Sequence, residues 1–264
     1  MPKVKCNDIN ICYEVQGKGY PLVMIMGLSA NMDWWDPKLI EETSRKYKIA
    51  IFDNRGAGRT DAPKIDYSIK MFADDTAKLM DNLKIQKAHV LGISMGGMIA
   101  QEFALTYPQR VEKLVLCSTS CGGIKSVPPA PKIMSVLSGG GARTPEDLVK
   151  NTIPVLFTED FIKGNPAFIK VVTERLMKAP IALDAYMRQV KAIMAWDTYA
   201  RLPKIKAPAL VMHGKKDILV PPENAKILAD RIPGAKLAYF DNSAHALFSQ
   251  ETDKVISTLL QFLA

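Results

Sequence analysis

A serine flanked by glycines is the first feature of the sequence that could do chemistry. Residues 92–96 read Gly-Ile-Ser-Met-Gly, a G-x-S-x-G pattern. It follows the apolar run His89–Ile93 and opens a helix-length segment that begins with small residues such as Gly97 and Ala100. A tight turn from strand to helix holds such a serine exposed, and glycines are needed because the turn has no room for side chains beside it. The pattern predicts that Ser94 is a nucleophile.

A serine hydroxyl becomes a nucleophile at neutral pH only with a general base, and the base needs an acid that orients it. With this kind of turn the chain order is serine, acid, histidine. Of the three histidines, His89 precedes the serine, and His213 comes before any acid in the loop that it enters, which leaves His245 as the base. Asp217 lies in that loop, four residues beyond His213, and is the expected acid.

The oxyanion that forms when an ester carbonyl is attacked needs two prepositioned N–H donors. Met95, the residue after the nucleophile, is expected to supply one of them through its backbone. The second is expected from Leu28, because the sequence Gly27-Leu28-Ser29 predicts a turn directly after the apolar run Leu22–Met26.

Eight short runs predict the sheet that positions these residues. Two of them alternate between apolar and polar residues, Val4–Cys6 and Ile9–Val15. The other six are almost continuously apolar, as is typical of strands buried on both faces of a parallel sheet. They are Leu22–Met26, Ile49–Phe52, His89–Ile93, Leu114–Cys117, Ala209–Met212 and Leu237–Phe240. Helix-length segments separate most of them, namely Met71–Leu83, Met95–Tyr107, Glu223–Ile232 and Thr252–Leu263. This alternation predicts an α/β fold with a mostly parallel central sheet flanked by helices.

The alternation stops between Ser120 and about Leu202. Ser126–Lys132 is rich in proline, and Ser138–Ala142 is rich in glycine, so the chain is expected to leave the sheet there. Helices are predicted from Thr144 onward, where Thr-Pro-Glu-Asp is typical of a helix start, and at Phe168–Lys178 and Leu183–Asp197. We therefore predict a core domain of residues 1–120 and 203–264, and a helical cap of residues 121–202 inserted after the sixth strand.

Methionines are expected to contribute to a substrate pocket between this cap and the sheet. The chain has 13 of them, and the flexible methionine side chain adapts to irregular apolar surfaces. Five could contact a substrate: Met98, Met134, Met177, Met187 and Met194. Lys215 and Lys216 are expected to be solvated, with attraction of an anionic substrate as the alternative.

Composition excludes several other classes of protein. The 264 residues carry a net charge of +8, but the basic residues are scattered, so nucleic acid is not an expected partner. No apolar stretch reaches the roughly 18 residues of a membrane span, and residues 1–16 lack the apolar core of a signal peptide, so we expect a cytoplasmic protein without a membrane partner. The four cysteines are then expected to be free thiols, and three histidines make a metal site unexpected.

Taken together, these motifs resemble the α/β-hydrolase family. Besides the turn at 92–97, residues 53–60 (D-N-R-G-A-G-R-T) are similar to the family's D-x-R-G-x-G-x-S loop, and His213–Asp217 and Ala244-His245 are similar to its acid and base segments. Trp35-Asp36 also matches the family pattern. Met26, however, stands where the family usually has a histidine before the oxyanion turn, which removes a hydrogen bond expected to stiffen that loop.

The resemblance implies an α/β-hydrolase fold and, within it, small carboxylesterases and 3-oxoadipate enol-lactone hydrolases are the most similar members. The latter also lack the histidine that Met26 replaces, and a serine at position 94 argues against a haloalkane dehalogenase. We therefore expect a cofactor-independent serine hydrolase that cleaves small to medium carboxylic esters through an acyl-enzyme. The alternatives are an enol-lactone or carbon–carbon bond hydrolase acting on an anionic ring-cleavage product, or a hydrolase-fold receptor that binds a small ligand with little turnover.

Overall fold

A single eight-stranded sheet runs through the computed structural model, which describes residues 1–264. The strand order is β1-β2-β4-β3-β5-β6-β7-β8, with β1 and β2 antiparallel to their neighbours and all other pairs parallel. The strands are β1 (Lys3–Cys6), β2 (Ile9–Gln16), β3 (Tyr20–Ile25), β4 (Tyr47–Phe52), β5 (Ala88–Ile93), β6 (Val111–Cys117), β7 (Ala209–Gly214) and β8 (Lys236–Phe240). Each of the eight predicted runs overlaps one of these strands, and the predicted α/β class is confirmed.

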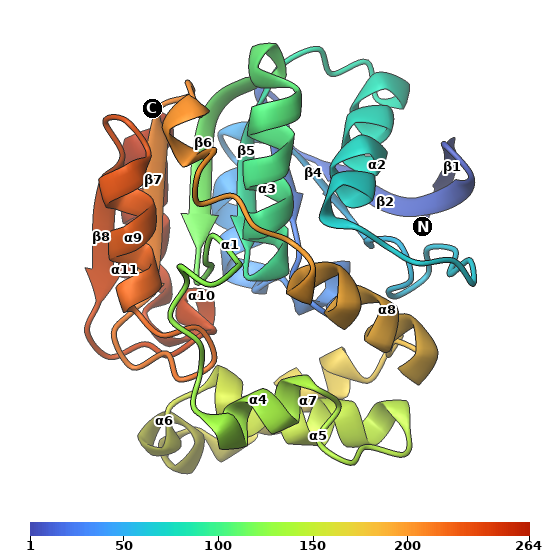
Figure 1. Cartoon of the computed structure of the whole chain (residues 1–264), viewed down its shortest axis with the longest axis vertical. Helices are drawn as coiled ribbons and strands as arrows, with labels where there is room; N and C mark the ends of the chain where they lie inside the picture. Colours follow the sequence, from blue (N-terminus) through green and yellow to red (C-terminus); the bar gives the residue numbers. More distant parts are fainter.

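Helices cover both faces of the sheet, because the central strands are apolar on both sides. On one face Val23 and Val90, which pair across β3 and β5, pack in a core with α2 (Ile69–Asn82), α3 (Met95–Thr106) and α9 (Glu223–Arg231). On the other face Leu22 and Met24 pack with α1 (Pro37–Ser44), α10 (Leu247–Gln250) and α11 (Thr252–Leu263). Figure 1 shows α2 and α3 in front of the sheet and α1 behind it.

Five further helices come between β6 and β7 and are called the cap below. They are α4 (Pro131–Leu137), α5 (Pro145–Leu156), α6 (Glu159–Gly164), α7 (Pro166–Leu176) and α8 (Leu183–Met194). In Figure 1 helices α4 to α7 lie beyond the carboxyl ends of the strands, and α8 lies between them and the helices of the core. None of the helices combines the length and the hydropathy that a bilayer-spanning segment requires.

The start of α5 shows how local sequence specifies the cap. The Thr144 side chain accepts a hydrogen bond from the backbone N–H of Asp147 at 3.1 Å, and the Asp147 carboxylate accepts one from the N–H of Thr144 at 3.0 Å. This capping box satisfies two N–H groups that the helix itself cannot. The short helices α1, α4, α6 and α10 were not predicted, although Asp36 followed by Pro37 is an N-cap signal for α1.

Candidate active site

Ser94 lies at the turn between β5 and α3 in a strained backbone conformation. Its φ of 57° and ψ of −123° are rarely adopted by residues other than glycine. A Cβ atom at Gly92 would overlap the carbonyl oxygen of Gly96, and one at Gly96 would overlap that of Ile25. The Ser94 N–H donates to the Cys117 carbonyl at 2.9 Å and so ties the turn to the neighbouring strand β6. The two glycines are therefore what allows the serine to be held at the end of the sheet.

Asp217 follows β7. It is buried, and both oxygens of its carboxylate have hydrogen-bond partners. Its Oδ1 accepts hydrogen bonds from the N–H groups of Leu219 and Val220, each at 2.9 Å, and its Oδ2 is 2.8 Å from Nδ1 of His245. Burial opposes ionisation of this carboxyl, but the His245 charge and the hydrogen bonds from His213 and His245 outweigh it and hold the pKa of Asp217 below its ordinary value. Asp217 is therefore a carboxylate at neutral pH.

His213 is a second histidine beside this carboxylate, and its surroundings differ from those of His245. The side chain of His213 is completely buried, and its Nε2 lies 2.9 Å from the Val220 carbonyl and 3.3 Å from Asp217 Oδ2. Since a carbonyl oxygen only accepts, Nε2 carries the proton. His213 does not line the cavity described below. It supports the loop that carries Asp217.

His245 lies in the loop between β8 and α10, and hydrogen bonds to the backbone hold it on both sides of the ring-bearing residue. Ser118 Oγ donates to the His245 carbonyl at 3.0 Å, and the N–H of Ala246 donates to the Leu156 carbonyl at 2.9 Å. Leu156 is near the end of cap helix α5, where carbonyls have no partner within the helix. Because a carboxylate only accepts, Nδ1 of His245 donates to Asp217, and Nε2 is left without a partner in the protein.

His89 lies away from these groups, at the amino end of β5. Its ring packs against those of Tyr20 and Tyr47, with centroid distances of 4.8 and 5.6 Å. Burial lowers the pKa of His89 to about 4, and the positive charge of Lys113 adds to the shift. His89 is thus neutral at pH 7 and belongs to the core.

The turn predicted to hold one oxyanion donor is fixed by side chains from distant parts of the chain. The N–H of Leu28 donates to no acceptor in the protein. Beside it, Ser29 has a φ of 63°, and its N–H donates to Oε1 of Gln189 in cap helix α8 at 2.9 Å. Asn54 Nδ2 donates to the carbonyl of Met26 at 2.8 Å. Gln189 and Asn54 thus stiffen the turn that follows β3, and no signal in the sequence indicates either contact.

The other predicted donor is the N–H of Met95, at the first position of α3. The N–H groups of the first helical turn have no acceptor within the helix. The positive end of the helix dipole adds to the stabilisation of negative charge at this point. Met95 and Leu28 both line the same cavity as Ser94.

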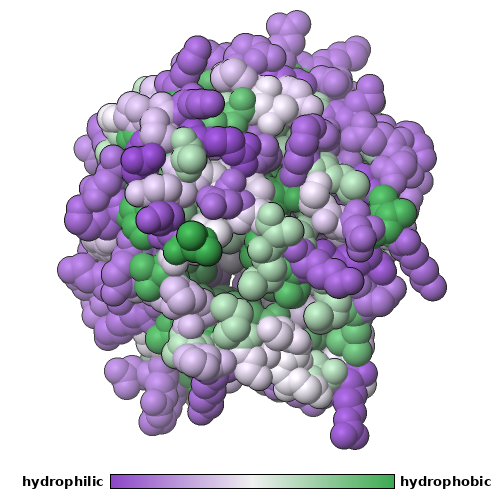
Figure 2. All heavy atoms as spheres, in the orientation of Figure 1, coloured by the Kyte–Doolittle hydropathy of each residue, from purple (hydrophilic) through white to green (hydrophobic).

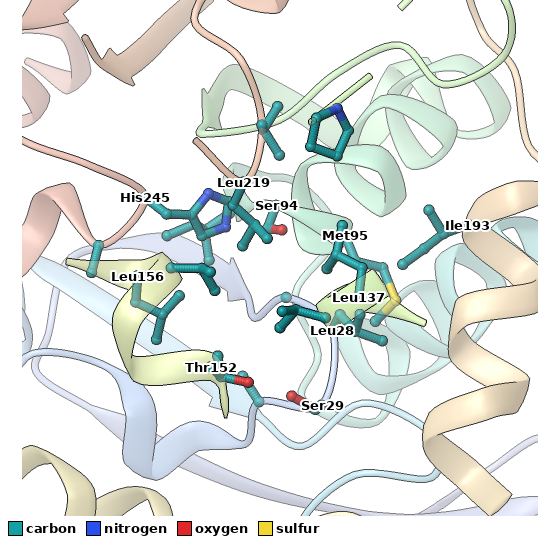
Figure 3. Close-up of a pocket in the computed structure, with 18 of the residues that line it drawn as sticks. Leu28, Ser29, Ser94, Met95, Leu137, Thr152, Leu156, Ile193, Leu219 and His245 are labelled. Atoms are coloured by element: carbon teal, nitrogen blue, oxygen red, sulfur yellow. The ribbon is translucent and has the colours of Figure 1, made fainter. Parts of the chain in front are cut away.

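A cavity of about 700 Å³ lies between the carboxyl edge of the sheet and the cap, and it contains Ser94 and His245. In Figure 3 both side chains point into this space, facing Leu137, Leu156 and Ile193. No hydrogen bond joins Ser94 Oγ to the His245 ring; catalytic hydrogen bonds are often long or poorly aligned until substrate binds. Figure 2 shows an opening near the centre of one face of the molecule, bordered by hydrophobic side chains.

The predicted methionines divide into two groups. Met98, Met134 and Met194 line the cavity, whereas Met177 and Met187 do not. Met177 packs against the small core of the cap, and Met187 is 40% exposed on α8. The prediction that these two contact substrate is therefore corrected. A helix period alone could not tell which side of each cap helix would face the sheet.

The remaining predicted polar positions lie outside the cavity. Lys215 forms a surface ion pair with Asp241 at 2.7 Å, and Lys216 is exposed. No three or more His, Cys, Asp and Glu side chains are grouped so as to hold a metal ion. All four cysteines are buried and unpaired.

Comparison with known proteins identifies the family. The sequence model of the alpha/beta hydrolase fold matches residues 20–156. The chain belongs to this family. It is 30% identical to the poly(3-hydroxyalkanoate) depolymerase of Ectopseudomonas oleovorans, over 92% of this chain and 84% of that protein.

Two solved structures are also similar along almost the whole chain. The enol-lactonase of Burkholderia xenovorans LB400 has a TM-score of 0.88 and 27% identity, covering 99% of both chains. An esterase from Exiguobacterium antarcticum has a TM-score of 0.85 and 26% identity, covering 98% of both. These relatives support hydrolase activity for this α/β-hydrolase.

Proposed function

We propose that this α/β-hydrolase cleaves carboxylic esters with Ser94 as nucleophile, His245 as general base and Asp217 as the acid that orients it. The proposal is carried by one observation: three features that a serine nucleophile requires occur together at one cavity. Ser94 is held in a strained turn, His245 and Ser94 face the same space, and a carboxylate of depressed pKa fixes the His245 ring at 2.8 Å. The named activities of the similar proteins include esterase and enol-lactonase.

In the first half of the proposed reaction Ser94 Oγ attacks the ester carbonyl carbon while His245 Nε2 takes its proton. The backbone N–H groups of Leu28 and Met95 stabilise the negative charge that forms on the carbonyl oxygen. The tetrahedral intermediate then breaks its bond to the alcohol oxygen, which leaves with the proton from His245. An acyl group remains bound to Ser94.

In the second half a water molecule gives its proton to His245 and attacks the acyl carbon. The bond to Ser94 Oγ breaks, Ser94 regains the proton, and the acid is released. Asp217 remains ionised throughout and stabilises the imidazolium form of His245. A lactone is a cyclic ester, so the same steps open it, with the difference that the alcohol stays attached to the acyl group.

The apolar cavity fits an acyl or alkyl group of moderate size. Sites of about 300–1,000 Å³ are typical of small-molecule ligands, and this cavity measures about 700 Å³. Its walls are mostly hydrophobic, so they exclude water from the reacting carbonyl and strengthen the electrostatic contribution of the N–H donors.

The test is hydrolysis of p-nitrophenyl esters from acetate to long acyl chains by the wild type and by Ser94→Ala. We expect the substitution to lower kcat by several orders of magnitude, as removal of a triad serine does. Ser126→Ala is a matched control, because Ser126 lines the same cavity and is expected to leave the rate unchanged. A fluorophosphonate should add its mass to the wild type and not to Ser94→Ala.

Two results would overturn the proposal. Equal turnover by the wild type and Ser94→Ala would show that another group is the nucleophile. No turnover of any ester or lactone, together with strong stabilisation of the protein by a small ligand, would indicate a receptor instead of an enzyme. Circular dichroism of each variant verifies that a lost rate does not reflect lost folding.

A further inference from the structure

Arg175 is a cation without a carboxylate partner at the wall of the candidate active site. It lies in the last turn of cap helix α7 and lines the same cavity as Ser94. Two other arginines near the cap are paired, Arg188 with Asp184 at 3.1 Å and Arg201 with Glu102 at 2.8 Å. The one hydrogen bond of Arg175 runs from Nη1 to the Trp35 carbonyl at 3.5 Å, which is long for such a bond.

The nearest acidic groups are engaged elsewhere. Asp33 forms an ion pair with Arg59 at 2.6 Å. Asp36 caps helix α1 through the N–H of Lys38 at 3.0 Å and accepts a hydrogen bond from Ser249 Oγ at 3.0 Å. Burial lowers the pKa of Arg175 even though the charges of Asp33 and Asp36 oppose this shift. The guanidinium remains charged at neutral pH, and no carboxylate lies close enough to form an ion pair with it.

Several N–H donors around Arg175 have no acceptor, and Asp36, the one carboxylate that lines the cavity, already accepts from the N–H of Lys38 and from Ser249 Oγ. Its Nε is buried without a hydrogen-bond partner, and so are the indole Nε1 atoms of Trp34 and Trp35. Both tryptophans line the cavity too, and Trp34 belongs to the 3₁₀ turn η1 (Met32–Trp34), which packs against α7. Leaving a buried donor unpaired costs free energy. An anionic group entering the cavity would supply acceptors for these unpaired donors.

A purely structural role explains less of this arrangement. A cation in the last turn of a helix stabilises the helix dipole, and Arg175 is placed to do so. That role is served equally well by an exposed side chain in water. It gives no reason for a half-buried guanidinium at the wall of an apolar cavity, where desolvation opposes the charge.

We propose that Arg175 binds a carboxylate of the substrate, so that the preferred substrate is an ester or lactone carrying a second carboxylate that does not react. This inference rests on the proposed function, and it narrows the substrate class. The planar guanidinium can donate two parallel hydrogen bonds to one carboxylate, which fixes the orientation as well as the charge of the ligand. The net charge of +8 favours the approach of such an anion.

The experiment compares substrates that differ only in this charge. One series consists of mono-p-nitrophenyl esters of adipic, pimelic and suberic acids, each compared with the same compound after methylation of its free carboxylate. A further pair, 4-carboxyphenyl butyrate and its methyl ester, carries the charge on the alcohol side. For at least one pair we expect kcat/KM of the wild type to favour the charged substrate by about tenfold or more, the usual effect of a charge-assisted hydrogen bond.

Arg175→Gln should abolish this preference by lowering kcat/KM of the charged substrate about tenfold to a hundredfold, mainly through KM, while the methylated substrate is cleaved as before. Arg175→Lys should retain part of it, because lysine keeps the charge and loses the bidentate geometry. Arg143→Gln is the matched control: it removes one positive charge from an exposed position of the cap and should leave the preference intact.

The outcomes separate this inference from the proposed function. A wild type that cleaves methylated esters and shows no preference for charge in any pair overturns the role of Arg175 and leaves the esterase proposal standing. The role of Arg175 is equally overturned if Arg175→Gln slows both members of every pair to the same extent. If neither charged nor methylated esters are cleaved, it is the proposed function that fails.

Discussion

The floor of the cavity, at the carboxyl edge of the sheet, and its roof, formed by the cap, are held in place by different interactions. On the floor Ser94 has a strained backbone, and both oxygens of Asp217 are occupied by hydrogen bonds within 2.9 Å. The roof is held by apolar packing. Its core consists of Val149, Ile153, Phe157, Val172 and Leu176. Hydrogen bonds thus fix the position of the side chains on the floor, whereas the shape and volume of packed apolar side chains fix those in the roof.

This difference assigns separate tasks to the two regions. Hydrogen bonds and close glycine contacts fix atoms in position, and a misplacement of about 1 Å can lower the rate of a reaction about a hundredfold. Apolar packing tolerates exchange between side chains of similar volume. The floor is therefore the region whose alteration should abolish turnover, and the roof is the region whose alteration should change which ester is accepted.

The separation is incomplete, because hydrogen bonds connect the two regions at the proposed catalytic groups. The Leu156 carbonyl of α5 accepts from Ala246, next to His245. Gln189 of α8 accepts from Ser29, next to Leu28, and donates to the Arg55 carbonyl at 2.9 Å. Through these contacts the roof holds the floor, and substitutions there test how far the two tasks are independent.

The largest effect is expected on the floor, at Asp217. In Asp217→Asn an amide replaces the carboxylate that accepts from His245 Nδ1–H. The ring is then no longer held in the tautomer that carries its proton on Nδ1 and leaves Nε2 free to take the proton of Ser94. We expect kcat for p-nitrophenyl butyrate to fall by about ten-thousandfold, with a smaller change in KM. Asp241→Asn is the control, since Asp241 lies on the surface and pairs with Lys215. A loss of less than tenfold would mean that Asp217 does not orient the base.

A smaller effect is expected where the roof contacts the floor, at Gln189. Gln189→Leu keeps the volume and leaves the N–H of Ser29 and the carbonyl of Arg55 without partners. The turn that carries Leu28 should then lose its fixed position, and we expect kcat to fall by about tenfold to a hundredfold with KM little changed. Met187→Leu on the exposed side of the same helix serves as the control.

A change confined to KM in Gln189→Leu would contradict this interpretation, because it would place Gln189 among the groups that only bind substrate. The thermal unfolding midpoint of the variant, measured alongside, separates a displaced turn from a loosened cap. If kcat falls while the midpoint of Gln189→Leu matches that of Met187→Leu, the roof contributes to the geometry of the oxyanion site.

The floor could be predicted from the sequence to a greater extent than the roof. Each proposed catalytic group on the floor follows a strand, so the buried apolar runs in the sequence indicate where these groups lie. The chain order of serine, acid and histidine then selects His245 from three histidines. The glycines around Ser94 are a local signal of the strained turn. The structure places these residues together as expected, while their catalytic roles are still a prediction.

The helices of the roof could be predicted in part, but its contacts could not, because they have no local signature in the sequence. Gln189 and Ser29 are 160 positions apart in the chain, and nothing near either residue indicates the other. Arg175 is one of 35 basic residues, and its missing partner becomes visible only when the surrounding side chains are placed. The same holds for Met177 and Met187, where the helical segments were predicted correctly but the face turned toward the cavity was not.

The smallest effect is expected from a substitution within the roof itself, such as Leu137→Ala. Leu137 of α4 points into the cavity (Figure 3), and its carbonyl accepts from the Tyr186 hydroxyl at 2.8 Å, a bond that the substitution preserves. The added space should benefit long acyl chains, shifting the ratio of kcat/KM between octanoate and acetate esters by about tenfold. The acetate ester, which does not reach the roof, should be cleaved at the wild-type rate. An equal loss for both esters would show that the roof, too, fixes the catalytic groups, and the division between the two regions would then have to be abandoned.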